Sequence, residues 1–172
     1  MDLVPKKKGL KILDAGCGEG HLIEMLTREE ENNSYYGIDI TKVALLKAKK
    51  RCPHTIIKNI DLSNISFDDG YFDVVICSEV IEHIIEYKKV ISELKRVTKK
   101  GGYFIITFPN ETIWTISRFL LGRRPIKVPD HVNSFKPNIM KSLVGLKLIL
   151  GKGMPYKLPF FLSLGYIMKF KK

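Results

Sequence analysis

The chain has 172 residues, of which 45% are hydrophobic and 27% charged, and these values suit one globular domain over residues 1–172. No apolar run approaches the roughly 18 residues that span a bilayer, and Met1–Lys8 lacks the apolar core of a signal peptide, so we expect a cytoplasmic protein. The cysteines, Cys17, Cys52 and Cys77, are odd in number and show no C-x-x-C spacing. They argue against a disulfide framework or a zinc site.

The net charge of +11 is unevenly distributed along the chain. Residues 1–86 hold 11 Lys and Arg against 15 Asp and Glu, a net of −4, whereas residues 87–172 hold 18 against 3, a net of +15. A basic half favours acidic partners such as nucleic acid, anionic lipid headgroups or an anionic small molecule, although a plain solvated surface has the same composition.

Short apolar runs alternate with segments of helical periodicity over the first two thirds of the chain. The predicted strands are residues 10–13, 35–38, 55–60, 72–77 and 103–108. The predicted helices are residues 20–31, 41–51 and a third through residues 90–97, which we expect Gly101-Gly102 to end. This alternation predicts an α/β fold with a doubly wound, mostly parallel sheet of the seven-stranded type and helices on both faces.

Beyond Pro109 the pattern is weaker. We expect a helix over residues 112–121, a loop over 123–137, a further helix from 138 to 143 and a strand over 146–150. The aromatic residues from Arg118 onward fit a core role, with an antiparallel C-terminal hairpin that closes the sheet. Among them are Phe119, Phe160, Phe161, Tyr166 and Phe170. We assign residues 1–108 to a cofactor half and residues 109–172 to a basic, acceptor-side half.

The clearest functional signal is a predicted strand that runs into Asp14 and then into glycines at positions 16, 18 and 20, before a helix. Glycine permits a tight turn and a close approach of backbone to a ligand, and a helix N-terminus offers free N–H groups. A dinucleotide fingerprint, G-x-G-x-x-G, would place its third glycine at position 21, which is His21. The spacing therefore disfavours a pyrophosphate ligand, and a purely structural turn remains the alternative.

Three later segments place polar residues at or just after the ends of the second, third and fourth predicted strands. Asp39 ends the second predicted strand, where a carboxylate can accept two hydrogen bonds from a ribose diol. Asp61 follows the third strand and precedes Phe67 by six positions, and Ser78–His83 follows the fourth strand. With the acid-and-glycine turn, this set resembles the class I, Rossmann-like S-adenosylmethionine-dependent methyltransferases, and within them the small-molecule and quinone methyltransferase group.

The resemblance implies that S-adenosylmethionine is the cofactor. It implies that the glycines pass beneath the methionine part and that Asp61 accepts a hydrogen bond from the adenine amino group. The predicted cofactor-binding residues are Asp14, Gly16, Cys17, Gly18, Gly20, Asp39, Ile40, Asp61, Leu62, Ser78 and Glu79.

Two histidines are the predicted catalytic residues. His83 follows the fourth strand, and an ordinary imidazole pKa near ~6.5 suits proton transfer at neutral pH. His131 lies in a His-then-Phe segment that relatives place near the acceptor pocket. Both histidines could instead be structural. Glu79, Glu82 and His83 would share a face of a helix, and some quinone-biosynthesis O-methyltransferases hold a metal with a similar group, but we expect no metal here.

The function that we expect is methyl transfer from S-adenosylmethionine to a small-molecule acceptor of anionic or lipid-like character. From Arg118 onward, 12 basic residues accompany one acid and many large apolar residues, a mixture that fits peripheral contact with an anionic membrane. Nucleic acid is a less favoured partner. The alternatives left open are an RNA-directed methyltransferase, a non-catalytic cofactor-binding partner subunit and, more distantly, an NAD-dependent oxidoreductase.

Overall fold

The computed structural model describes residues 3–124, 130–155 and 162–172. Its elements in chain order are β1 (Lys11–Ala15), α1 (His21–Glu29), β2 (Ser34–Asp39), α2 (Lys42–Arg51), β3 (Ile56–Asn59), β4 (Phe72–Ser78), the short 3-10 helix η1 (Ile81–His83), α3 (Tyr87–Val97), β5 (Thr98–Pro109), α4 (Glu111–Leu120), α5 (Pro137–Val144), β6 (Lys147–Met154) and β7 (Gly165–Lys171). These bounds agree with most of the elements predicted from the periodicity.

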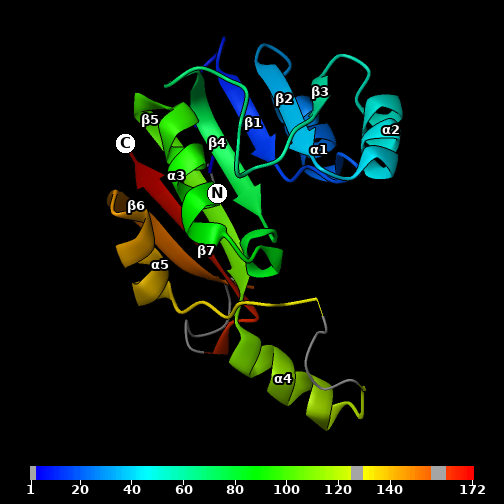
Figure 1. Cartoon of the computed structure of the whole chain (residues 1–172), viewed down its shortest axis with the longest axis vertical. Coiled ribbons are helices and arrows are strands. Elements are labelled where there is room, and N and C mark those ends of the chain that lie inside the picture. Colours follow the sequence, from blue (N-terminus) through cyan, green and yellow to red (C-terminus); the bar gives the residue numbers. More distant parts are fainter. Residues whose placement is uncertain (1–2, 125–129, 156–161) are drawn as a thin grey trace.

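One sheet of seven strands organises the molecule, in the order β3-β2-β1-β4-β5-β7-β6 (Figure 1). The first five strands run parallel, whereas β7 pairs antiparallel with both β5 and β6. The predicted α/β fold with a mostly parallel sheet and a C-terminal antiparallel hairpin is confirmed.

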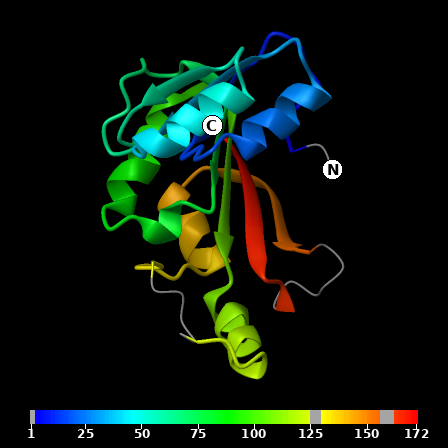
Figure 2. The same ribbon diagram turned by 90° about the vertical axis from the view of Figure 1, so that its right-hand side faces the viewer.

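Helices cover both faces of the sheet (Figures 1 and 2). On one face, α1 and α2 bury Ile23 and Leu45 against the sheet. On the other face, α3 and α5 bury Leu94 and Met140. β4 lies at the centre and is apolar along most of its length, as expected for a parallel strand covered on both faces. Among the described residues, no helix combines the length and the apolar character that crossing a membrane requires.

The start of β5 differs from the prediction. The helix α3 ends at Val97, and β5 begins at Thr98 and continues through Gly101-Gly102, which we expected to separate the two elements. The register against β4 shifts between Phe72 and Val74, so the glycine pair lies in an irregularity of the strand. A Cβ at Gly102 would lie 2.7 Å from a backbone oxygen of β4, which explains why the strand carries glycine there.

The large apolar residues of the C-terminal half divide into two groups. Tyr166 and Phe170 of β7 are buried, as expected for a hairpin that closes the sheet. Phe119 in α4 is 67% exposed, so the expectation of a core role is wrong for it. The predicted core residues Phe160 and Phe161 lie outside the described residues.

Candidate functional site

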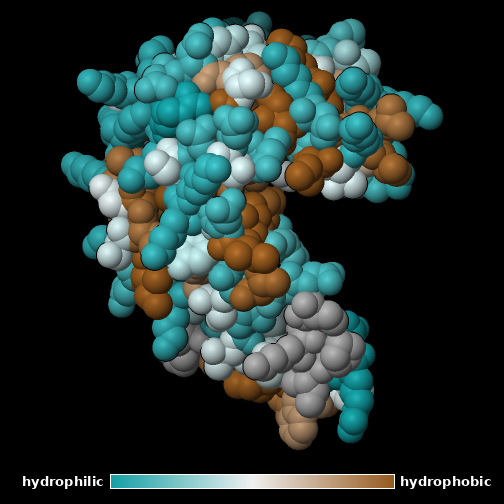
Figure 3. Space-filling model, viewed as in Figure 1, coloured by the Kyte–Doolittle hydropathy of each residue, from teal (hydrophilic) through white to brown (hydrophobic). Residues whose placement is uncertain are grey.

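A cavity of about 770 Å³ opens at the carboxyl ends of β1, β2, β3 and β4. Ligands bind at this edge in open parallel sheets, and the volume lies within the roughly 300–1,000 Å³ of small-molecule sites. Figure 3 shows the molecule hollowed between the part that holds β1, β2 and β3 and the part that holds α4. The predicted site residues that line the cavity are Gly16, Asp39, Ile40, Asp61, Leu62, Glu79 and His83.

The turn after β1 lies close against the loop that follows β4. Gly16 has a φ of +83°, and a Cβ at this position would lie 2.5 Å from Cγ2 of Val80. Only glycine meets both conditions, because other residues are strained at this φ and no space exists for a side chain. The glycine therefore allows the two loops to pack closely, and its backbone forms part of the cavity wall.

Asp39 is held in place by backbone N–H groups from two loops. Its Oδ2 accepts a hydrogen bond from the N–H of Gly18 (2.9 Å), and its Oδ1 accepts one from the N–H of Thr41 (2.8 Å). A carboxylate offers about four acceptor positions, so both oxygens retain capacity for hydroxyl donors from the cavity. The fixed orientation fits the predicted role of Asp39 in binding a ribose diol.

Asp61 and Leu62 begin a loop whose backbone is hydrogen-bonded to an arginine of α3. Arg96 donates hydrogen bonds to the backbone oxygens of Ile65 (2.7 Å) and Phe67 (2.8 Å). Its neighbour Glu93 accepts one from the N–H of Ile65 (2.9 Å) and pairs with Arg96. The sequence prediction missed both residues. Their separation by three positions on a helix was visible in the sequence, but nothing in it indicated which loop they would contact.

Asp14 does not line the cavity. The residue is 3% exposed, and burial, followed by the negative charge of Asp39, raises the pKa of its carboxyl to about 7. A contact of its side chain with the cofactor remains a prediction.

Four further predicted cofactor residues, Cys17, Gly18, Gly20 and Ser78, also do not line the cavity. The backbone N–H of Gly18 donates a hydrogen bond to Asp39 instead. Burial raises the pKa of the Cys17 thiol to about 12, so this side chain is a neutral core group. Gly20 is the N-cap of α1, and a Cβ there would lie 3.1 Å from Cβ of Ala48, so its small size allows α1 to pack against α2. Ser78 shares a hydrogen bond with Thr107 Oγ1 (2.9 Å).

Glu79 adopts a left-handed backbone conformation, with a φ of 54°, where β4 leaves the sheet. Its Oε1 accepts a hydrogen bond from the hydroxyl of Thr107 (2.7 Å). The expectation that Glu79, Glu82 and His83 share a helix face is wrong, because only Ile81–His83 form the short helix η1 and Glu79 precedes it. Non-glycine residues with such a φ concentrate at functional sites, which agrees with its place on the cavity wall.

His83 and His131 are brought together, although 47 positions lie between them in the chain. Their ring centroids are 4.8 Å apart. Nδ1 of His83 lies 2.8 Å from the backbone oxygen of Asp130, and since a carbonyl only accepts, Nδ1 carries the proton in this contact. Nε2 of the same ring lies 3.9 Å from Oε1 of Glu82. Nδ1 of His131 contacts Oε1 of Glu111 at 2.5 Å. Both predicted catalytic residues thus have an oriented ring, but only His83 lines the cavity.

Glu82 completes this cluster from the buried side. It is 1% exposed, and its Oε2 has no hydrogen-bond partner among the described residues. Burial raises the pKa of this carboxyl to about 7. One ligand atom each from Glu82, His83 and His131 lies within 4.8 Å of the others, so these three residues could hold a divalent ion.

Comparison with known proteins identifies the family. Residues 6–144 match the family model described as Methyltransferase domain. The chain therefore belongs to the methyltransferase domain family, within the class I S-adenosylmethionine-dependent methyltransferases that its sequence resembles. At the level of the family, the prediction that S-adenosylmethionine is the cofactor is confirmed.

Several relatives are similar over part of their length. The ubiquinone biosynthesis O-methyltransferase of Shewanella sp. is 29% identical over 147 residues, which cover 79% of this chain and 61% of that protein. The phthiotriol/phenolphthiotriol dimycocerosates methyltransferase of Mycobacterium tuberculosis is 34% identical over 98 residues, 56% of this chain and 36% of that protein. Protein MJ0638 of Methanocaldococcus jannaschii is 28% identical over 180 residues, 96% of this chain and 76% of that protein. The chain spans 42% of a Mycolicibacterium smegmatis methyltransferase.

Solved structures share the fold. PH0226 of Pyrococcus horikoshii superposes with a TM-score of 0.74 at 22% identity and covers 96% of this chain and 83% of that chain. A chain in the complex of the Haloferax volcanii Trm112 methyltransferase activator with a methyltransferase gives a TM-score of 0.79 at 14% identity, over 97% of this chain and 83% of that chain. At these identities the similarity shows the fold alone.

Proposed function

We propose that this protein transfers a methyl group from S-adenosylmethionine to a nucleophilic atom of a small acceptor with anionic or lipid-like character. One observation carries the proposal. His83, a group able to take a proton, lines the same cavity as Asp39 and Asp61, the residues predicted to hold the cofactor. Cofactor binding and acceptor activation would therefore take place in one continuous space.

Different residues of the chain would bind the cofactor and deprotonate the acceptor. Asp39 and Asp61 would bind the ribose and adenine parts, and the wall at Gly16 would allow the methionine part close approach. S-adenosylmethionine supplies a methyl carbon that its sulfonium already makes electrophilic. The protein needs to align the acceptor and remove its proton where the acceptor is a hydroxyl or amine. Nε2 of His83 would accept that proton, with the ring held through Nδ1 by the Asp130 carbonyl.

The character of the acceptor is inferred from what surrounds the cavity. Val80, Ile84 and Ile85 line it, and Ile85 is 80% exposed, so an apolar portion of an acceptor finds contacts there. The basic half of the chain, with its net of +15 over residues 87–172, favours an acceptor that carries negative charge. Both features suit an amphipathic molecule better than a neutral polar one.

A metal-assisted version of the same transfer is the second candidate. It is favoured by the unpartnered Oε2 of Glu82, a buried carboxylate oxygen beside two oriented imidazoles. A divalent ion held by Glu82, His83 and His131 would lower the pKa of an acceptor hydroxyl, so that the proton would pass to water and His83 would serve as a ligand instead of a base. Activity lost on chelation and restored by one divalent ion would favour this version. Activity that chelators leave unchanged would favour His83 as the base.

The test begins with binding and continues with transfer. Calorimetry should show binding of S-adenosylhomocysteine and none of NAD. Transfer of a labelled methyl group should then be assayed on anionic amphiphiles, neutral small molecules and RNA. His83→Gln should lower the rate roughly 10²- to 10⁴-fold and leave S-adenosylhomocysteine affinity unchanged. Methylation of RNA alone, or cofactor binding without transfer to any acceptor, would contradict the proposal.

A further inference from the structure

The helix α4 stands apart from the rest of the fold. None of its residues is buried, whereas α1, α2, α3 and α5 each bury at least two. Figures 1 and 2 show it projecting beyond the end of the sheet, with little contact to the main body. A ten-residue helix gains little stability from its own hydrogen bonds. The side chains on its surface therefore indicate which kind of contact stabilises it.

Large apolar side chains gather at the distal end of this helix. Ile116, Phe119 and Leu120 are spaced so that they share one face, and their exposed fractions are 48%, 67% and 76%. Leu121, which follows the helix, is 68% exposed. Figure 3 shows hydrophobic colour at this end of the molecule, beside hydrophilic residues. Such a cluster of exposed apolar residues marks a contact surface.

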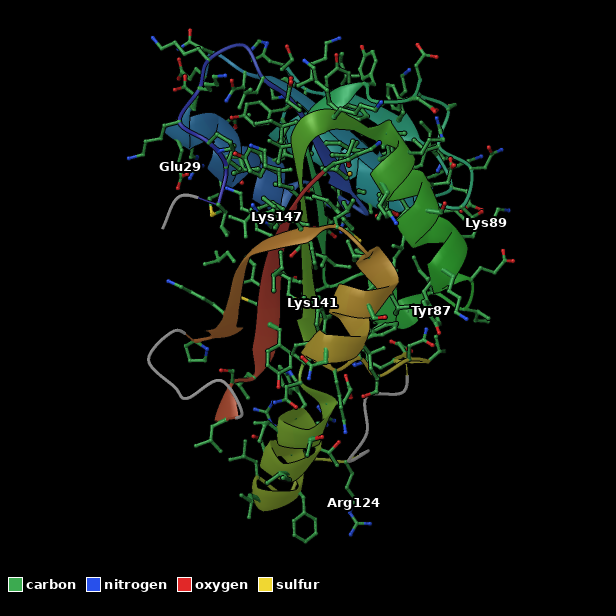
Figure 4. The ribbon with its side chains drawn as sticks, turned by 90° about the vertical axis from the view of Figure 1, so that its left-hand side faces the viewer. Glu29, Tyr87, Lys89, Arg124, Lys141 and Lys147 are labelled. Atoms are coloured by element: carbon green, nitrogen blue, oxygen red, sulfur yellow. The ribbon has the colours of Figure 1, made fainter. Side chains whose placement is uncertain are left out.

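The described residues at this end of the molecule are basic. Residues 112–124 include Arg118, Arg123 and Arg124, but no Asp or Glu. Arg123 and Arg124 are exposed, directly after the apolar cluster. Figure 4 shows Arg124 at the far end of α4, directed away from the body of the protein. The positive charge and the apolar side chains thus occur on one projecting tip.

We propose that the tip formed by Ile116, Phe119, Leu120, Leu121, Arg123 and Arg124 docks on an anionic phospholipid bilayer. The apolar side chains would enter the boundary between headgroups and acyl chains, and the arginines would contact lipid phosphates, as in interfacial amphipathic helices. The proposal does not depend on the identity of the methyl acceptor.

Charge and area favour a membrane over a protein partner. A second copy of the tip would bring further arginines against these arginines, with no acid in the described residues 112–124 to offset the repulsion. Four side chains at the end of a helix about 15 Å long also offer far less than the ~800 Å² per partner of a stable protein interface. A bilayer needs neither a complementary shape nor a large area, and it supplies negative charge.

Docking here would also orient the candidate site. Glu111, the first residue of α4, contacts His131, so the helix leads from the histidine cluster to the tip. A bilayer at the tip would therefore lie at the end of α4 that points away from the histidine cluster.

The proposal is tested with the full chain and vesicles of phosphatidylcholine, alone or mixed with phosphatidylglycerol. Trp114, the single tryptophan, lies in α4 and reports binding by its fluorescence, with cosedimentation as a second measure. We expect binding to the anionic vesicles alone, with a steep loss from about 0.05 to 0.5 M salt as the screening length falls from roughly 14 to 4 Å.

Two paired variants separate charge from apolar contact. Arg123→Ala with Arg124→Ala should weaken vesicle binding roughly 30-fold, and Phe119→Ser with Leu120→Ser should weaken it at least as much. The matched control is Lys88→Ala with Lys89→Ala, which removes the same charge from exposed positions on α3 and should have a smaller effect. All variants should keep the affinity for S-adenosylhomocysteine and the melting temperature of the wild type.

Four results would overturn the proposal. They are no binding to anionic vesicles at low salt, equal binding to neutral vesicles, an equal loss in the α3 control, and a dimer that disappears in the Phe119 and Leu120 variant. Binding to an RNA oligonucleotide that depends on Arg123 and Arg124, without vesicle binding, would assign the tip to nucleic acid instead.

Discussion

The carboxylate of Asp39, at the end of β2, accepts a hydrogen bond of 2.9 Å from the backbone N–H of Gly18, in the turn after β1. One side chain therefore does two things: it fixes the glycine turn and presents oxygens to the cavity. Removing the whole side chain would disturb the turn as well as the ligand contacts, so an isosteric substitution gives the cleaner test.

Asp39→Asn should weaken cofactor affinity by about 1.5 to 3 kcal/mol, which is a factor of roughly 10 to 150. The amide keeps one oxygen for a backbone N–H, but it loses the negative charge and one acceptor. Calorimetry with S-adenosylhomocysteine measures the affinity, and a thermal melt checks the fold. Asp39→Ala should reduce both the cofactor affinity and the melting temperature, because it also leaves the N–H groups of Gly18 and Thr41 without their acceptor. An unchanged affinity in Asp39→Asn would show that the residue serves the turn alone.

Substitution of two glycines of the turn should have unequal effects. Gly16→Ala should cost about 2 to 4 kcal/mol of stability, because strain at a φ of +83° adds to a contact of 2.5 Å with Val80. Gly18→Ala should cost only the backbone strain, about 1 to 2 kcal/mol, because nothing lies within 4 Å of a Cβ there. Urea unfolding of both variants measures the difference.

A second substitution identifies the cause of the larger effect. Val80→Ala should restore part of the stability lost in Gly16→Ala, since it removes the atoms that the new Cβ meets. A cost for Gly16→Ala equal to that of Gly18→Ala, with no effect of the second substitution, would contradict the close contact between the two loops.

Asp14 should make the protein less stable as the pH rises. Its folded pKa, raised to about 7, lies above its ordinary value of 3.8. Below the ordinary value both states hold the proton. As the pH rises toward 7 the unfolded chain releases it while the folded chain keeps it, so stability falls through this window and levels off above it. Asp14→Asn cannot ionise and lacks this decline.

The stability difference between Asp14→Asn and the wild type should therefore grow by up to about 4 kcal/mol from pH 4 to pH 8. Denaturant unfolding at several pH values measures it. Glu82, whose pKa is also raised to about 7, adds a decline of the same sign to both proteins and cancels in the difference. A constant difference across this range would mean that Asp14 is ionised in the folded protein at low pH.

Arg96 should matter for the cofactor although it lies outside the cavity. Arg96→Lys should weaken S-adenosylhomocysteine binding roughly 3- to 10-fold and destabilise the fold by about 1 to 3 kcal/mol, because an ammonium cannot reproduce the planar fork that holds the Ile65 and Phe67 carbonyls. Arg28→Lys is the matched control, since Arg28 is 76% exposed and pairs on the surface with Glu24. Equal effects of the two substitutions would refute a role for Arg96 in holding the loop.

Local pattern predicted the parts of the fold that depend on neighbours in the chain. Strand and helix alternation placed β1 to β4, and the motifs at the ends of the first two strands located Gly16 and Asp39 on one cavity. The start of β5 was misplaced, because the glycine pair that usually ends a helix lies here inside an irregular strand. Contacts between distant segments were not predictable. Among them are the ring contact of His83 with His131 and the hydrogen bonds from Arg96 to the loop that Asp61 begins.

The position of β7 between β5 and β6 has a consequence for how the chain folds. Residue 103 pairs with residue 171 and residue 109 with residue 165, so joining β7 to β5 closes a long loop of chain. Residue 154 pairs with residue 165, so β6 and β7 meet over a much shorter one. Because loop closure costs more entropy as the loop lengthens, we expect the hairpin to form first and then to add to β5 as a preassembled unit. Until it does, β5 is an edge strand with an unpaired backbone, open to pairing with another chain.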